Sequence, residues 1–441
     1  MENASRRLTP GEKRGKRFER WLALRNVKFT GTVAEEAYRA RVARFIKAIK
    51  LEEPDRVPVI LPAAFFPAYY AGTTLEKAIY DLTELKRTWL KFLHDFEADA
   101  YHGPGIVLPG RALEILDYRL YKWPGHGLAS DVLSYQFVEG EYMMPDEYDA
   151  LINDPSDFWL RTYVPRLFGG LAPFRQLSPL TGIIEIPMGY LASYARPDVQ
   201  AALEALTKAG REMAKWLEAI GEVNRQALEA GYPAVWTGFA KAPFDVLGDT
   251  MRGTLGIMKD LFQRPDRLRE AMLKIAPLVI EAAVKSADAS GIPTVMMPLH
   301  KGADGFLSAK QFETFYWPTL RQVILALIEE GLVPVLFAEG SYNTRLELVK
   351  DLPEASVIWY FDQTDIARAK EILGDTACLA GNVPASLLAT GKPEVVKEHC
   401  RRLIEVCGRG GGYILTGGTA IDKCNPENLR AMMAAALEYG R

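Results

Sequence analysis

Short apolar runs alternate with longer amphipathic segments along most of the chain, and this alternation is the feature that most constrains its fold. Apolar positions with a period near 3.6 predict helices, and alternating strands and helices are typical of a mostly parallel sheet. The strand candidates span residues 57–61, 98–102, 183–188, 234–239, 294–299, 333–337, 357–361, 377–380 and 413–415. The predicted helices include residues 199–228, 265–286, 308–330, 366–373 and 393–406.

Two architectures share this alternation, a closed barrel and a doubly wound open sheet. The turn that follows the first strand candidate, Gly72-Thr73-Thr74, is too short for the glycine-rich phosphate-binding fingerprint of many open sheets. We therefore expect an α/β fold of the TIM type, a (β/α)8 barrel. Because nine strand candidates exceed the eight staves of such a barrel, one candidate should lie outside the ring.

Two parts of the chain depart from the alternation. Residues 1–50 are charged and helix-forming, so we expect an N-terminal helical extension ahead of a barrel over residues 51–441. Residues from about 107 to 180 carry Trp, Tyr, Pro and Gly in irregular order. They predict a large insertion between early strands, and long insertions in compact enzymes are usually functional loops.

The charge pattern and the cysteines indicate where the protein works. A formal net charge of -3, with both signs mixed along the chain, offers no basic face for nucleic acid. The first 20 residues lack the apolar core of a secretory signal, and no apolar run is long enough to span a bilayer. The four cysteines form no CxxC pair, which fits a reducing compartment. We expect a cytoplasmic protein with no nucleic-acid or membrane partner, and the sequence leaves its oligomeric state open.

Polar side chains follow several strand candidates at the point where each strand ends. In a barrel such side chains point into the mouth and are catalytic candidates. His300, Glu339 and Asp362 each come directly after an apolar run. An imidazole and a carboxylate on adjacent strands can share one proton or one metal ion, so His300 and Glu339 are candidate acid, base or metal ligands. The alternative is that His300 bonds a loop carbonyl while Glu339 pairs with Arg345 or Lys301.

Other side chains near the strand ends are candidates for binding a substrate. The aromatic residues after the first strand could wall a pocket for a flat ligand, or they could cap the barrel core. The loop that contains Asp249 and Arg252 could bind a ligand or be held by salt bridges. The substrate-binding candidates are Phe65, Phe66, Tyr69, Asp249, Arg252, Tyr342, Asn343, Arg345 and Asn382.

Four spaced motifs in the last quarter of the chain resemble the uroporphyrinogen decarboxylase superfamily. They are Ala380-Gly381-Asn382-Val383-Pro384, residues 390–396, residues 411–415 and residues 425–429. The resemblance extends from Arg56 to the C-terminus. The superfamily also contains the methylcobamide methyltransferases of anaerobic one-carbon metabolism, and it implies a (β/α)8 barrel.

Departures from the family pattern bear on the activity that the resemblance implies. The decarboxylase carries an arginine-rich segment after its first strand, whereas residues 61–66 of this chain contain no arginine. The methyltransferases that act on coenzyme M hold zinc with a His-x-Cys pair and a later Cys. The matching positions here are Phe337-Ala338-Glu339 and Thr419, so only Glu339 could still be a ligand.

The resemblance therefore implies a corrinoid-protein-dependent methyltransferase of the O-demethylase type. It would move a methyl group from a small methoxylated aromatic donor to the cobalt of a separate corrinoid protein. His300 and Glu339 would relay a proton or bind zinc, and Asp362 would orient them. The corrinoid would arrive on a partner, because the chain lacks an Asp-x-His-x-x-Gly motif.

Two other activities stay open at this point. One is a decarboxylase of a uroporphyrinogen-like or other polycarboxylate, with Arg252 and Arg345 as carboxylate-binding groups. The other is a carrier of a corrinoid or tetrapyrrole.

Overall fold

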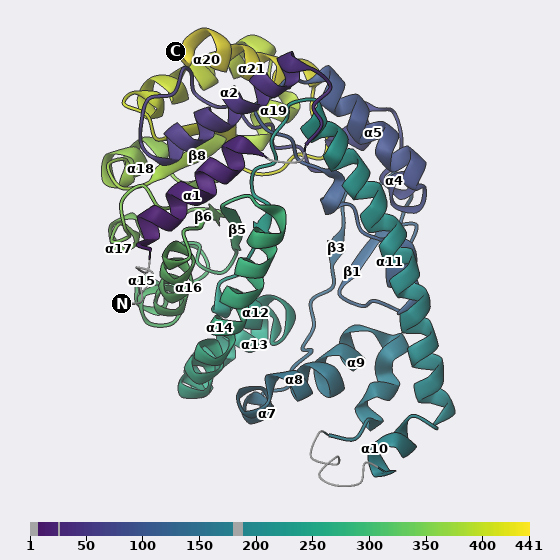
Figure 1. The fold of residues 1–441 in the computed structure, drawn as a ribbon. Helices are drawn as coiled ribbons and strands as arrows, with labels where there is room; N and C mark the ends of the chain where they lie inside the picture. The colour runs from purple at the N-terminus through teal and green to yellow at the C-terminus, as the bar shows by residue number, and fades with distance from the viewer. Residues whose placement is uncertain (1–7, 25–26, 180–187) are drawn as a thin grey trace, which may run out of the picture.

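The centre of the molecule is a six-stranded parallel sheet whose strands follow chain order, β4-β5-β6-β7-β8-β9. The computed structural model describes residues 8–24, 27–179 and 188–441. The strands are apolar and largely buried, as expected when helices cover a parallel sheet (Figure 1). Their bounds are β4 Gly238–Phe239, β5 Thr294–Leu299, β6 Val333–Ala338, β7 Ile358–Phe361, β8 Cys378–Val383 and β9 Tyr413–Gly417.

Two earlier extended segments, residues 57–61 and 98–102, join the two edges of this sheet. Residues 57–61 pair with β9. Residues 98–102 are bonded to residues 57–61 on one side and to the residues that lead into β4 on the other. Eight of the nine predicted strand segments are thus linked in order by backbone hydrogen bonds. The linking bonds run from Ile60 N to Leu415 O (3.0 Å), from Asp99 N to Val59 O (3.0 Å) and from Tyr101 N to Pro233 O (3.1 Å).

The ninth strand candidate, residues 183–188, lies outside the described residues except for its last position. Met188 begins the helix α10 (Met188–Ser193), so that position is helical and not extended.

The helices between the strands match the predicted segments closely. The main difference lies in residues 308–330, where a π-helical turn at Phe312–Tyr316 interrupts the predicted helix. Another π-helical turn, Ile404–Gly408, ends the predicted helix 393–406. The helix bounds are α11 Pro197–Glu229, α12 Pro243–Thr250, α13 Gly253–Gln263, α14 Pro265–Ser290, α15 Ala309–Gln311, α16 Trp317–Glu329, α17 Leu346–Val349, α18 Ile366–Leu373, α19 Ala385–Thr390, α20 Pro393–Leu403 and α21 Pro426–Tyr439.

The N-terminal part is helical, as the sequence predicts. The helices α1 (Pro10–Ala23) and α2 (Thr32–Ile49) pack aromatic side chains such as Trp21 and Phe45 against strand residues of the central sheet. In Figure 1 these two purple helices lie across the sheet near β8. They therefore belong to the same packed core as the sheet.

Two helices follow Thr74 in close succession. Asp81 separates them, because its carboxylate accepts hydrogen bonds from the amides of Thr83 and Glu84 and starts a new helix. The helices in this region are α3 Phe66–Tyr70, α4 Leu75–Tyr80 and α5 Leu82–Asp95.

The irregular region that begins near residue 107 forms a small sheet and short helices. It packs on α12 and α13, since the amides of Tyr142 and Met143 both donate to Met251 O, at 2.8 and 2.9 Å. Its elements are α6 Gly110–Ile115, β1 Tyr121–Pro124, β2 Gly127–Leu128, β3 Gln136–Phe137, α7 Tyr148–Asn153, α8 Pro155–Asp157 and α9 Val164–Leu167, with 3-10 helices at Pro104–Ile106 and Gly169–Gln176 and a π-helical turn at Phe158–Tyr163. Across the described ranges, no helix combines the length and apolarity needed to cross a bilayer.

One buried carboxylate ties the first two extended segments to α2. Asp99 is fully buried and pairs with Arg44 (2.5 Å) and Arg56 (2.6 Å). It also accepts the amide of Val59 at 2.8 Å. Two cations and a backbone amide thus converge on one side chain where the ring of segments begins.

We expect Asp99→Asn to lower the free energy of unfolding by about 3 kcal/mol, because it leaves two arginines without their buried partner. Asp55→Asn is the matched control, since Asp55 pairs with the same Arg44 but its side chain is 63% exposed. We expect the control to cost less than about 1 kcal/mol. Urea denaturation measures both, and equal losses would contradict the assigned role of Asp99.

Candidate active site

The carboxyl ends of β5 and β6 lie side by side, since Leu299 pairs with Ala338. The next residue on each strand is His300 or Glu339, and the structure brings these two side chains together. His300 Nε2 lies 3.5 Å from Glu339 Oε1. The other ring nitrogen, Nδ1, lies 2.6 Å from Asp249 Oδ2. The imidazole is therefore held between two carboxylates, and the alternative pairings of Glu339 with Arg345 or Lys301 are not formed.

Two aspartates on α12 hold the end of β5. Asp245 and Asp249 are one helical turn apart, so both project from the same face of the helix. Asp245 accepts the backbone amides of His300 and Lys301, both at 3.0 Å, and the Tyr316 hydroxyl at 2.6 Å. These bonds fix the backbone at His300 and therefore restrict where its ring can lie.

Asp249 is the centre of a buried charge cluster. Besides His300, it pairs with the ammonium groups of Lys301 (3.1 Å) and Lys241. The side chain of Lys301 runs past Gly248, where an added Cβ would lie 2.8 Å from its Cδ and Cε, so a larger residue there would displace Lys301. Sequence reasoning treated Asp249 as a substrate-binding candidate and missed Lys241. Lys241 is the second residue after β4, and its place near a strand end was the available signal.

The charges around His300 set its protonation. Burial alone would lower the pKa of His300, but the hydrogen bonds to Asp249 and Glu339 outweigh it and raise this pKa to about 10. Burial would raise the pKa of Asp249, yet His300 and Lys241 hold it well below its ordinary value. Burial and the nearby charge of Asp249 raise the pKa of Asp245. At neutral pH the site thus holds an imidazolium paired with an ionised Asp249.

Asp362 lies beside this cluster and acts on the backbone. Its Oδ2 accepts the amide of Gly340 at 3.0 Å, so it holds the residue that follows Glu339. Burial raises the pKa of Asp362, and the charge of Glu339 adds to the effect. Asn382 in β8 donates to the carbonyls of Asp362 (3.1 Å) and Thr364 (2.8 Å). Asp362 and Asn382 therefore link the strand ends of β6, β7 and β8.

Aromatic side chains from the irregular region lie close to the charged groups. Burial raises the pKa of Tyr121, and the charges of Asp249 and Glu339 contribute, which places this phenol within their electrostatic reach. The rings of Tyr121 and Tyr135 are 6.3 Å apart, and Tyr135 contacts Phe65 edge-on at 4.7 Å. Sequence reasoning named Phe65 and missed both tyrosines, because they come from a segment without periodicity.

The other aromatic candidates after the first strand lie differently. Phe66 is fully buried and packs between Phe92 and Phe96 of the neighbouring helix region, both at 5.9 Å. For Phe66 the core-capping alternative is the one that the structure supports. Tyr69 is 36% exposed and lies under the Lys423 ammonium at 5.3 Å.

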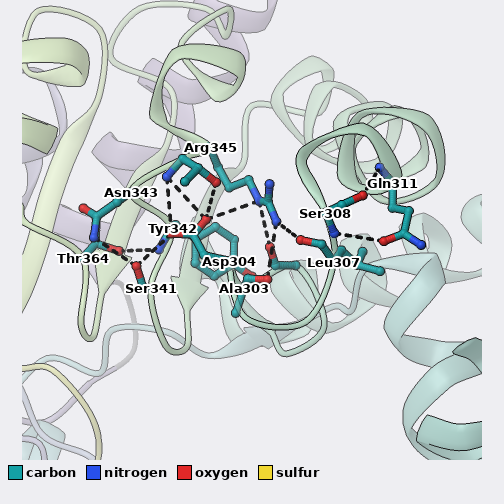
Figure 2. A network of polar contacts seen from close by, with 12 residues as sticks. Ala303, Asp304, Leu307, Ser308, Gln311, Ser341, Tyr342, Asn343, Arg345 and Thr364 are labelled. Carbon is teal, nitrogen blue, oxygen red and sulfur yellow. Dashed lines mark hydrogen bonds and ion pairs between the residues drawn. The ribbon is translucent and has the colours of Figure 1, made fainter.

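Arg345, Tyr342 and Asn343 hold loops together (Figure 2). The buried guanidinium of Arg345 donates to the carbonyls of Gly302 and Leu307, and Tyr342 OH donates to Leu299 O at 2.9 Å. Asn343 donates to Ser341 and accepts the amide of Asp365, which caps α18. Their polar groups face protein partners.

Arg252 is likewise committed to protein partners. Its guanidinium donates to Asp260 at 2.6 Å and to the carbonyl of Met143. Because Arg252 is buried and fully paired, the salt-bridged reading of its loop is the one that the structure supports.

The donor set does not fit the zinc ion that the sequence suggested. A catalytic zinc usually takes three protein ligands, and no cluster of three His, Cys, Asp or Glu side chains occurs in the described part of the chain. Both nitrogens of His300 already face carboxylates. Cys424, near the position of the later family cysteine, is buried, and burial raises the pKa of its thiol to about 12. The two carboxylates around His300 suit a protonated imidazole better than a metal ion.

The sequence pattern of the family described as uroporphyrinogen decarboxylase (URO-D) matches residues 184–439, more than half of the chain. The protein belongs to the URO-D family. URO-D membership implies a TIM barrel, and the ring of eight linked segments agrees with that implication.

Curated URO-D relatives share about a quarter of their residues with the matched part. The uroporphyrinogen decarboxylase of Methylococcus capsulatus is 27% identical over 214 residues, and that of Syntrophotalea carbinolica is 26% identical over 210. Each alignment covers 46% of this chain and 59% of the relative. Among solved structures, a methyltransferase from Methanosarcina mazei matches with a TM-score of 0.58 at 18% identity, covering 91% of this chain and 98% of that one. At this identity the match shows the shared fold.

We expect His300 to stay protonated up to about pH 10, because two carboxylates stabilise its cation. Its contribution to stability is complete below pH 6.5 and is lost as the pH rises through about 10. The stability advantage over His300→Gln should therefore shrink across this interval. NMR titration of the His300 ring measures the midpoint directly, and Asp249→Asn should lower it. An unchanged midpoint in that variant would contradict the assigned partner.

Proposed function

We propose that the protein is a methyltransferase that moves a methyl group from a small methoxylated aromatic donor to the cobalt of a separate corrinoid protein. The observation that carries the proposal is the ring of His300, held between the carboxylates of Asp249 and Glu339. Its protonated ring supplies an acid where an oxygen could be released. The solved methyltransferase with the same fold gives independent support.

The chemistry needs an acid at the departing oxygen. Phenoxide is a poor leaving group, since a phenol has a pKa near 10, and protonation lowers the barrier to its release. When the O–CH3 bond breaks, its electron pair stays on the oxygen and the carbon passes to the acceptor. His300 Nε2 gives its proton to that oxygen and becomes neutral. Asp249 then stabilises the Nδ1–H of the neutral ring, so the tautomer stays fixed.

The remaining groups position this acid. Asp245 fixes the backbone of His300, and Asp362 fixes the backbone that follows Glu339. The 41% exposure of the Glu339 side chain leaves it open to a bound molecule. Phe65, Tyr121 and Tyr135 would form one wall for a flat ring.

The acceptor belongs to a partner. The corrinoid protein would supply a reduced cobalt that accepts the methyl group. The same proposal includes a barrel over residues 51–441, an insertion at about 107–180 beside its mouth, and a cytoplasmic location.

We expect His300→Gln to slow phenol release from a methoxylated aromatic by at least about 10²-fold, because it removes the acid. Chromatography of the demethylated product, with and without reduced corrinoid protein, measures the rate. The wild-type rate should fall as the pH rises through about 10, and the variant should lose that fall. Asn343→Ala is the control for loop damage and should keep the pH profile. Corrinoid-independent release, or no methyl transfer from any methoxylated donor, would refute the proposal.

A decarboxylase of a polycarboxylate is the second candidate, and the names of the curated relatives favour it. Its carboxylate-binding groups were expected to be Arg252 and Arg345. Both are buried and donate to protein partners. Release of carbon dioxide from uroporphyrinogen by the purified protein would support this candidate over the methyltransferase.

A further inference from the structure

A cavity of about 1120 Å³ opens along the seam where residues 98–102 run beside the segment leading into β4. The helix α1 and residues 290–292, which precede β5, form other parts of its wall. His300 follows the opposite end of β5, and a six-residue strand rises roughly 20 Å. The cavity is therefore separate from the candidate active site, and its volume suits a small molecule.

Two lining residues carry buried polar atoms without a partner. The Tyr101 hydroxyl and His102 Nε2 make no hydrogen bond within the described ranges. Burial lowers the pKa of His102 to about 4, so its ring is neutral at physiological pH and can donate or accept. Buried polar groups are nearly always paired, so these two atoms distinguish this wall from an ordinary apolar core.

An aromatic surface adjoins these polar atoms. The ring of Trp236 lies 5.1 Å from that of His102 and 5.1 Å from that of Tyr360. The backbone of Trp236 has a φ of 67°, a conformation that bulky residues rarely adopt and that concentrates at functional sites. Trp236 remains partly exposed and lines the cavity, so a flat ring could stack on it.

The charges on α1 give the cavity an excess of positive charge. Lys16, Glu19 and Arg20 line it from this helix, all three exposed. None of these three forms an ion pair with another described residue, whereas Arg225 on the facing helix is paired with Glu229. Two cations and one carboxylate leave one positive charge for a ligand.

We propose that this cavity binds a planar aromatic molecule that carries one anionic group, such as an aromatic carboxylate. The ring lies against Trp236 and His102, and the carboxylate pairs with Lys16 and Arg20. The inference does not depend on methyl transfer, because it uses none of the residues around His300.

Calorimetric titration of the full-length protein with 2-naphthoate tests the proposal. We expect one site, with much weaker binding of cyclohexanecarboxylate, which lacks the aromatic face, and of 2-naphthalenemethanol, which lacks the charge. The double variant Lys16→Gln with Arg20→Gln should weaken 2-naphthoate about tenfold. Lys13→Gln is the matched control on the same helix, since Lys13 pairs with Glu330 away from the cavity. It should leave the Kd unchanged.

His300→Gln separates the two sites. We expect it to leave 2-naphthoate binding unchanged while methyl transfer is lost. Quenching of tryptophan fluorescence by 2-naphthoate should shrink in Trp236→Phe, which also reports on the site if the calorimetric signal is small. Absence of binding to the wild-type protein, loss of binding in His300→Gln, or equal weakening by Lys13→Gln would each overturn the proposal.

Discussion

The parallel, in-order pairing of β4 to β9 is the constraint on which the rest of the structure depends. Each strand is followed by a return helix, so every strand enters the sheet from the same side and ends at the same edge. Lys241, His300, Glu339 and Asp362 follow four consecutive strands, so all four lie at this edge of the sheet. The register of β5 on β6 then sets the 3.5 Å separation of His300 and Glu339.

Buried carboxylates determine what this edge can do. An imidazole that is partly buried would ordinarily lose its proton, since burial disfavours a charge. Asp249 reverses this preference for His300, while its own charge is balanced by Lys241 and Lys301. Asp245 instead accepts hydrogen bonds from two backbone amides and from the Tyr316 hydroxyl. Asp249 therefore balances the charge of His300, while Asp245, one helical turn away, positions the backbone of His300.

The departures from related enzymes point in the same direction as the geometry. At the positions where the family resemblance implies the thiolates of the coenzyme M methyltransferases, this chain has Glu339 and Thr419. Where the decarboxylase places arginines after its first strand, this chain has Phe65 and Phe66. Phe65 contacts Tyr135, and Tyr135 lies near Tyr121, so aromatic contacts extend from the first strand toward the charged groups. The proposed function uses both features, the protonated His300 and these aromatic side chains.

The sequence by itself determined the order of strands and helices, because hydrophobic periodicity is a local property that each segment carries. It also indicated His300, Glu339 and Asp362, since a polar residue directly after an apolar run marks a strand end. Only the tertiary structure decided their partners. Asp249 became the partner of His300, and the charges of Asp249 and Glu339 act on Tyr121, which comes from a segment without periodicity. Arg252 and Arg345 were equally plausible by sequence as substrate-binding groups. In the structure Arg252 pairs with Asp260, and Arg345 donates to loop carbonyls. Pairing of charges depends on which elements pack together, and that information is absent from the spacing of residues along the chain.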